Sequence, residues 1–295
     1  MTSDTDKISC SVGILTFNSA ASLPVCLESV KHFSEIIICD GGSTDSTIEI
    51  ARKFGCVVIK QDDKYKYDNN KISDFSGVRN QLLDKSSNEW FLYIDSDEFL
   101  STGVVSELRS ILLNQKENSI EAYRMPRKFV CKGMVIDCAA SYPNYQMRFF
   151  QISYTKGFVK KLHERILLKD GVLTGTLTGF VMVPVETDIF LLKSKHEYYL
   201  SIVKERLRNS SYKALFNNFC FTARALLGRL VKTLRSRFFY VGNKLPVCHE
   251  LLVIRQETRL LILPIRIASA RVHHSSLSFI RKFNVYCCKV NNIFR

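Results

Sequence analysis

The sequence predicts an α/β fold with a mostly parallel sheet flanked by helices, followed by a basic and mainly helical C-terminal region. Short apolar runs alternate with helical patterns through the first hundred residues, which is typical of right-handed βαβ units. Acidic side chains follow one of these apolar runs directly, and the positive charge gathers in the last third of the chain. We therefore expect two parts, residues 1–190 and residues 191–295.

Three strands and two helices are expected within the first sixty residues. The strands are predicted from three apolar runs, at 10–15, 36–39 and 57–59. A 3.6-residue spacing of apolar side chains from Leu23 to Phe33 predicts the first helix, with Pro24 in its first turn. The segment DGGSTD at 40–45 has the glycines of a tight turn and leads into a second helix that ends near Gly55.

A short helix from Asp74 precedes a hydrophobic strand at Trp90–Ile94, which delivers Asp95, Asp97 and Glu98 into a polar turn. Ligands of open α/β sheets bind beyond the carboxyl ends of the strands, so the acids stand at a predicted ligand site. Alternate carboxylates suit a hard divalent cation, Mg²⁺ or Mn²⁺, that is shared with substrate phosphates. Because solvated turns also carry acids, this short motif alone decides nothing.

A further helix is expected at 104–112, with strands at 122–125 and 129–136, the latter broken by a turn at Lys132-Gly133. Beyond them, the segment VKKLHER contains the pair His163-Glu164. Glutamate can take a proton from a hydroxyl group, and histidine can complete a metal shell. The spacing does not choose between these roles and a structural one.

The positive charge belongs to the C-terminal part. From Lys193 onward the chain has 20 Lys/Arg against 4 Asp/Glu, and before it 22 against 24, so the formal net charge of +14 lies in the last third. Leucines and basic residues alternate through 214–240 in the pattern of an amphipathic helix, which suits an anionic membrane surface. Ordinary helices with solvated basic faces are the alternative, and nucleic acid is disfavoured because no helix-turn-helix, zinc-finger or RNP signature is present.

The cysteines favour a reduced, cytosolic protein. None of the ten forms a C-x-x-C pair or a cluster with zinc spacing, and several lie in apolar, strand-like runs. The first residues do not resemble a secretory signal, and no transmembrane segment is expected.

Four linked motifs resemble the family 2 glycosyltransferases, which have the GT-A (Rossmann-like) fold. They are TFN at 16–18, DGGSTD at 40–45, DFSGVRN at 74–80 and WFLYIDSDE at 90–98. The later YPNYQMRFF and VKKLHER are similar to the lipopolysaccharide core β-glucosyltransferases of the WaaE/KdtX subgroup. The resemblance extends over roughly residues 8 to 170, and the last 120 residues or so match only weakly.

On the nucleotide side, the resemblance implies roles for five residues of the first two motifs. Thr16 and Asn18 would lie at the nucleotide pocket, and Asp40 would bind the base. Ser43 and Asp45 would shape the loop around it.

For the phosphates and the chemistry, the resemblance implies that Arg79 approaches the nucleotide or its phosphates. Asp95 would lie near the ribose and the metal, and Asp97 would be the principal metal ligand. Glu164 is our candidate for the base, with His163 as a metal or phosphate contact. Two other acids are less favoured as the base: Glu98 and Asp137.

The expected protein is a metal-dependent, inverting, hexosyltransferase-like enzyme that uses a UDP-sugar and Mg²⁺ or Mn²⁺. Its acceptor would be a glycan or a lipid-linked glycan, such as lipopolysaccharide core or another surface polysaccharide of the cell envelope. The basic C-terminal part would dock to the acceptor or hold the enzyme peripherally on the inner, cytoplasmic face of the membrane. Two alternatives stay open: a nucleotidyltransferase, and a non-catalytic nucleotide- or membrane-binding protein with the same fold.

Overall fold

The computed structural model describes residues 7–67, 72–114, 119–161 and 164–291, with side chains as far as residue 272. The chain divides into two compact units. Unit 1 comprises Met1–Val135 and Pro143–Val185, and unit 2 comprises Ile136–Tyr142 and Glu186–Arg295. Each unit has a hydrophobic core of its own.

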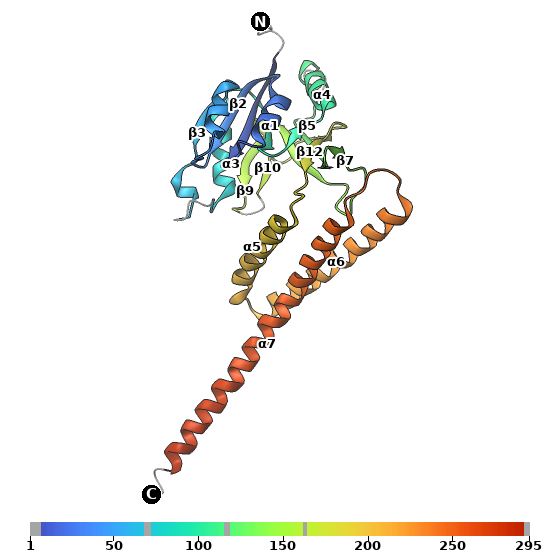
Figure 1. Cartoon of the computed structure of the whole chain (residues 1–295). Coiled ribbons are helices and arrows are strands. Elements are labelled where there is room, and N and C mark those ends of the chain that lie inside the picture. Colours follow the sequence, from blue (N-terminus) through green and yellow to red (C-terminus); the bar gives the residue numbers. More distant parts are fainter. Residues whose placement is uncertain (1–6, 68–71, 115–118, 162–163, 292–295) are drawn as a thin grey trace. The chain divides into compact units, whose positions relative to one another are not determined.

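Unit 1 is built on a mixed sheet whose strands follow the order β3-β2-β1-β4-β8-β6-β12-β5. Figure 1 labels β3 and β2 near one end of this order and β12 and β5 near the other. Its first four strands pair in parallel: β1 (Ile8–Thr16), β2 (Phe33–Asp40), β3 (Val57–Lys60) and β4 (Trp90–Asp95). The strands β1 and β4 are buried almost throughout and read as continuous apolar runs, as parallel strands covered on both faces do. The strands predicted at 10–15, 36–39, 57–59 and 90–94 are confirmed.

The second half of the sheet is mixed. The strand β8 (Tyr145–Gln151) runs antiparallel to both β4 and β6 (Ala122–Cys131). The remaining strands are short: β5 (Phe99–Leu100), β7 (Met134–Val135), β11 (Thr174–Thr176) and β12 (Val181–Pro184) belong to this sheet, whereas β9 (Thr155–Val159) and β10 (Arg165–Leu168) form a two-stranded sheet. The described residues of this unit also include 3₁₀ turns at Asp63–Tyr65 and Ile152–Tyr154.

Helices cover the sheet with one core on each side. The helices α1 (Leu23–Val30), α2 (Thr47–Lys53) and α4 (Thr102–Leu113) contribute to a core with Trp90 and Phe149. The helix α3 (Phe75–Lys85) contributes Val78, Leu82 and Leu83 to the other core. Pro24 lies in the first turn of α1, where its missing N–H costs no hydrogen bond, as predicted. The predicted α/β class with a mostly parallel sheet flanked by helices is confirmed.

One prediction about the strands was wrong. Residues 122–125 and 129–136 do not form two strands, because β6 continues through Pro126. On one edge β6 pairs with β8 as far as Pro126; on the other edge it pairs with β11 as far as Arg124 and with β12 from Arg127, so the partner on that edge changes around Pro126. A proline is tolerated there because its missing N–H falls where the ladder changes partner. The turn at Lys132-Gly133 is present, with positive φ at both residues.

Unit 2 is helical, as predicted for the C-terminal region, and contains α5 (Ile189–Arg208), α6 (Tyr212–Phe239) and α7 (Val247–Asn291). Its buried core is small: Val203, Leu207, Leu215 and Leu263. The side chains of Asp188 and Ser211 cap α5 and α6. Within the described part of the chain, no helix has the length and apolar content to cross a membrane.

Candidate functional site

The carboxyl ends of β1, β2 and β4 lie next to one another. Thr16 at the end of β1 is level with Asp40 on β2, and its neighbour Leu15 is level with Asp95 on β4. The chain places β2 and β3 on one side of β1 and β4 on the other, so the topology reverses between β1 and β4. Such a switch point is where open α/β sheets hold their ligands. The TFN, DGGSTD and DSDE segments therefore meet at one edge.

Asp40 organises the loop that follows β2. Its carboxylate accepts hydrogen bonds from the Thr16 hydroxyl at 2.8 Å, from the Ser43 hydroxyl at 2.6 Å, and from the backbone N–H groups of Gly42 and Ser43 at 2.8 Å each. Burial raises the pKa of Asp40, but the hydrogen bonds from Ser43, Thr16 and Gly42 outweigh it, and the net pKa is lowered. In this structure, the side chain predicted to bind the base is engaged by its own loop and by Thr16 at the end of β1.

Asn18 and Asp45 join the TFN loop to the DGGSTD loop. The backbone N–H of Asn18, which has a positive φ of 48°, donates to the Ser43 hydroxyl at 2.8 Å. The Asn18 side-chain oxygen accepts from the N–H of Thr44 at 2.8 Å, and Asp45 accepts from the N–H of Ala20 at 3.1 Å. Asparagine tolerates the left-handed backbone region better than most residues, which accounts for its place in this turn.

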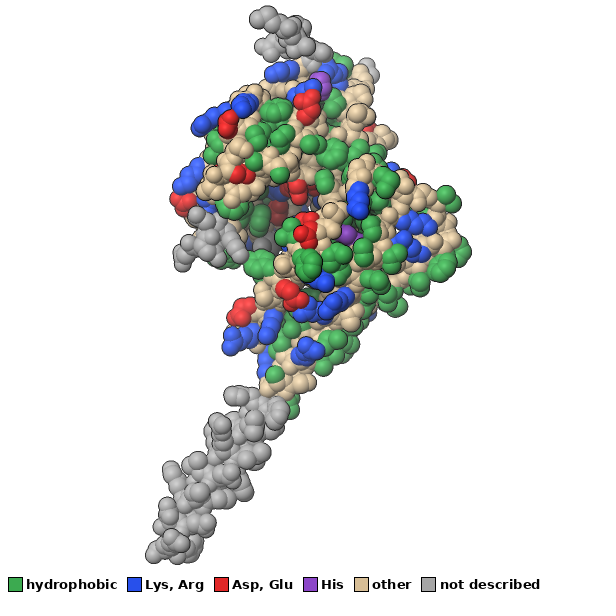
Figure 2. All heavy atoms as spheres, in the orientation of Figure 1, with side chains coloured by type: hydrophobic (Ala, Val, Ile, Leu, Met, Phe, Trp, Pro, Cys, Tyr) green, Lys and Arg blue, Asp and Glu red, His purple; other side chains and the backbone are tan. Residues whose placement is uncertain are grey.

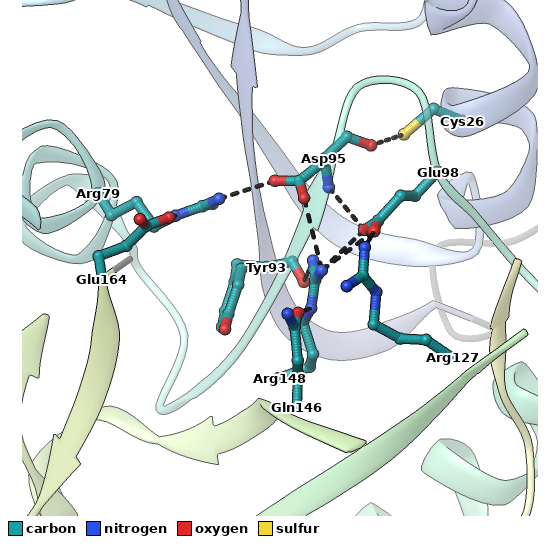
Figure 3. Close-up of polar contacts among 9 residues, drawn as sticks. All are labelled: Cys26, Arg79, Tyr93, Asp95, Glu98, Arg127, Gln146, Arg148 and Glu164. Carbon is teal, nitrogen blue, oxygen red and sulfur yellow. Dashed lines mark hydrogen bonds and ion pairs between the residues drawn. The ribbon is translucent and has the colours of Figure 1, made fainter. Parts of the chain in front are cut away.

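Arg79 connects α3 with two acids of the site (Figure 3). Its Nη2 atom donates to Oδ1 of Asp95 and its Nε atom donates to Oε1 of Glu164, both at 2.7 Å. The arginine side chain is only 6% exposed, and its guanidinium group lies 4.7 Å from the centroid of the Tyr93 ring. Its third nitrogen, Nη1, is buried without a hydrogen-bond partner among the described residues. This buried cation therefore has one hydrogen-bond donor that no described residue uses.

A second arginine, Arg148 on β8, contacts two acids of the DSDE segment. Its side chain is 1% exposed and pairs with Glu98, which is equally buried, at 2.9 Å. The same guanidinium group reaches Oδ2 of Asp95 at 3.5 Å and the carbonyl oxygen of Tyr93 at 3.2 Å. Glu98 is also paired with Arg127. Figure 3 shows Asp95 between Arg79 and Arg148, with a dashed contact to each.

The two arginines set the charge of Asp95. Burial raises the pKa of this carboxyl, but the positive charges of Arg148 and Arg79 outweigh it and hold the pKa well below the usual range. Asp95 is therefore a carboxylate with one oxygen directed to each arginine. In this arrangement it contributes to the shape and charge of the site before any ligand binds.

Asp97 differs from Asp95 because it is exposed and makes no hydrogen bond or ion pair with any described residue. The residue between them, Ser96, lies 3.0 Å from Ser19 between the hydroxyl oxygens. Among the described residues, no group of three or more His, Cys, Asp and Glu side chains could hold a metal ion. His163 lies outside the described residues. The donor set fits a cation that brings phosphate oxygens with it, since Mg²⁺ is often held by one or two carboxylates plus substrate phosphates.

The structure therefore gathers most of the predicted residues at one site in unit 1. Of the two acids that were less favoured as the base, Glu98 is buried between arginines, and Asp137 lies in unit 2, where it accepts from the N–H of Asn243. The structure also shows two residues that sequence reasoning missed, because Arg127 and Arg148 were not predicted as part of the site. A signal for Arg148 existed, because a charged residue among the apolar residues of a central strand needs a buried partner.

Comparison with known proteins relates part of this chain to glycosyltransferases. Residues 11–122 match the family model described as Glycosyl transferase family 2. The SPbeta prophage-derived glycosyltransferase SunS of Bacillus subtilis is 32% identical over 173 residues, which cover 55% of this chain and 35% of SunS. The putative glycosyltransferase EpsH of the same species is 23% identical over 175 residues, covering 56% of this chain and half of EpsH. The chain thus matches about a third to a half of the length of these relatives.

Solved structures with a similar arrangement include S. aureus TarS 1–349 in complex with UDP-GlcNAc, at 14% identity and a TM-score of 0.41 over 69% of this chain and 67% of that one. Another is glucosyl-3-phosphoglycerate synthase from Mycobacterium tuberculosis with Mn²⁺ and UDP, at 22% identity and a TM-score of 0.30 over 42% and 44%. The family match supports a glycosyltransferase family 2 domain in the N-terminal part of the chain. The narrower similarity to lipopolysaccharide core β-glucosyltransferases stays a prediction.

Proposed function

We propose that this chain is an inverting, metal-dependent glycosyltransferase that moves a hexose from a UDP-sugar to a glycan or lipid-linked glycan. The observation that carries the proposal is the ion-paired chain Glu164–Arg79–Asp95 at the switch point of a domain that matches glycosyltransferase family 2. The lipid-linked acceptor, with lipopolysaccharide core as one example, would place the enzyme at the cytoplasmic face of a membrane.

The donor diphosphate would lie against Arg79 and Asp97. The unused Nη1 donor of Arg79 supplies positive charge for a phosphate oxygen, and the exposed Asp97 supplies a carboxylate for a divalent cation. When bound, Mg²⁺ or Mn²⁺ would stabilise the negative charge that develops on the departing diphosphate. The loops that Asp40 and Asn18 hold together would form the wall for the nucleoside.

Glu164 would accept the proton from the attacking hydroxyl of the acceptor. In an inverting transfer the acceptor oxygen forms a bond to the anomeric carbon, and the bond from that carbon to the diphosphate oxygen breaks with its electron pair. Oε1 of Glu164 is held by Arg79, whereas its Oε2 makes no hydrogen bond with a described residue. The ion pair thus fixes the carboxylate and leaves one oxygen for the proton.

The first test is calorimetric titration of the full chain with UDP, with and without Mn²⁺. We expect binding that depends on the metal and that weakens at least about tenfold in Asp97→Ala, because the cation loses its protein ligand. The matched control is Asp170→Ala, since Asp170 is a fully exposed acid whose one ion pair among the described residues, with Lys156, is long and exposed. Equal binding by the wild type and Asp97→Ala, or no UDP binding by either, would contradict the assignment.

A further inference from the structure

The helix α6 carries large apolar side chains on the face that points away from the core of unit 2. They recur at spacings of three, four, seven and eleven residues, which places them in one stripe along the helix. The α6 stripe consists of Phe216, Leu227, Leu230, Val231, Leu234 and Phe238. The exposed fraction of Leu227 is 65% and that of Phe238 is 77%, so these side chains are not part of the folded core.

The opposite face of α6 does the packing within unit 2, and it is unusually polar. Buried residues on that face include Leu215, Thr222 and Ser236. Two ion pairs join α6 to α7, one from Arg229 to Glu257 and one from Arg237 to Glu250. A surface helix of a globular protein normally turns its apolar stripe inward and its charges outward. In α6 the apolar stripe faces outward instead, and exposed apolar patches of this kind mark interaction sites.

Positive charge borders the stripe. The sequence of α6 contains six Lys/Arg residues and no Asp or Glu. Four of the basic residues have exposed side chains: Lys213, Arg224, Lys232 and Arg235. Figure 2 shows green and blue side chains beside one another over the C-terminal end of α6 and the turn after it. Both the apolar stripe and its basic border are therefore accessible together.

We propose that the α6 stripe is an interfacial docking surface for a bilayer that contains anionic phospholipids. An apolar face bordered by Lys and Arg lies in the plane of such a surface, with its apolar side chains about 5–10 Å into the headgroup boundary. Each basic residue near an anionic surface adds to the attraction. Charge complementarity favours lipid over a second copy of this chain, because a second copy would bring the same positive charges to the contact. The inference concerns unit 2 alone and does not depend on the catalytic proposal.

The test is cosedimentation of the full chain with vesicles of phosphatidylcholine alone and of phosphatidylcholine with phosphatidylglycerol. We expect the wild type to bind the anionic vesicles more tightly, with binding that weakens as salt is raised. The triple variant Leu227→Gln, Val231→Gln and Leu234→Gln should bind at least about tenfold more weakly, because three apolar side chains no longer enter the interface. Arg224→Gln with Arg235→Gln should reduce the preference for anionic lipid.

The matched control is Val25→Gln, Leu113→Gln and Leu173→Gln, which replaces the same residue types at exposed positions of unit 1. It should bind vesicles like the wild type, and circular dichroism checks the helix content of both triple variants. Absence of wild-type binding to anionic vesicles, or equal binding by the stripe variant, overturns the proposal. A concentration-dependent dimer in sedimentation that becomes a monomer in the stripe variant would also overturn it and assign the stripe to a second copy.

Discussion

Arg79 and Asp95 meet with 2.7 Å between Nη2 and Oδ1, although one comes from α3 and the other from the end of β4. The same guanidinium group also binds Glu164, 85 residues further along the chain, so a single buried cation positions two acids of the site. The predicted roles of these residues can be separated experimentally, because their contacts differ.

Glu164→Gln tests the base. We expect kcat of sugar transfer to fall by about 10²–10⁴-fold while the affinity for UDP stays unchanged, because the amide cannot take a proton but does not touch the nucleotide. Steady-state kinetics and UDP titration measure the two effects. The control is Glu89→Gln, an exposed glutamate in the same unit. An unchanged kcat would remove Glu164 from the mechanism.

Arg148→Met tests the buried ion pair with Glu98. Removing one partner leaves a buried charge with fewer contacts, so we expect a loss of about 3–5 kcal/mol in the free energy of unfolding of unit 1. Trp90 is the single tryptophan and lies in unit 1, so its fluorescence in a urea titration reports this unit. Arg52→Met, on the exposed end of α2, should stay within about 0.5 kcal/mol of the wild type.

The double variant Arg148→Met with Glu98→Gln supplies the internal check. Because the double variant removes both charges of the Arg148–Glu98 pair, it should be destabilised by less than the sum of the two single variants, although Arg127 and Asp95 each lose one contact. Strict additivity would mean that the two side chains act independently.

The depressed pKa of Asp95 predicts a dependence of stability on pH. A carboxyl whose pKa is lowered by folding contributes stability that is fully present above its unfolded pKa of about 3.9, and this contribution is lost as the pH falls toward the folded pKa. Unit 1 should therefore lose stability below about pH 4. In Asp95→Asn, the difference in stability from the wild type should be largest near pH 7 and shrink on acidification. Urea titrations at several pH values, followed by Trp90 fluorescence, check this, and a pH-independent difference would contradict it.

Two glycines of unit 1 should respond to alanine in opposite directions. A Cβ atom on Gly13 of β1 would lie 2.4 Å from the ring of Phe91, which is fully buried, so Gly13→Ala should cost about 1–3 kcal/mol in the free energy of unfolding. No atom lies within 4 Å of such a Cβ on Gly103, in the first turns of α4. Gly103→Ala should stabilise by about 0.4–1 kcal/mol because it restricts the unfolded chain. Equal changes in the free energy of unfolding for the two variants would mean that close packing around Gly13 does not exclude a Cβ atom there.

Much of the fold could be predicted from local pattern. Apolar runs at β1 to β4 and the 3.6-residue spacing of α1, α3 and α4 appear in the sequence because strands and helices bury their side chains with fixed periods. The path of β6 through Pro126 could not be predicted, because it depends on a change of partner strand from β11 to β12 on one edge of β6. The division of function between the two units, and the roles of Asp97 and His163, stay predictions.

The sequence alone determined the α/β class, the order of the first strands, and the presence of acids after β4, since each depends on residues close together in the chain. The tertiary structure decided which charged side chains form ion pairs with one another. Arg79, Asp95, Arg148 and Glu164 come from separate elements, and only the pairing of β4 with β8 and the approach of α3 bring them together. The same holds for α6: its composition is visible in the sequence, but its partners in unit 2 decide that the apolar stripe faces outward.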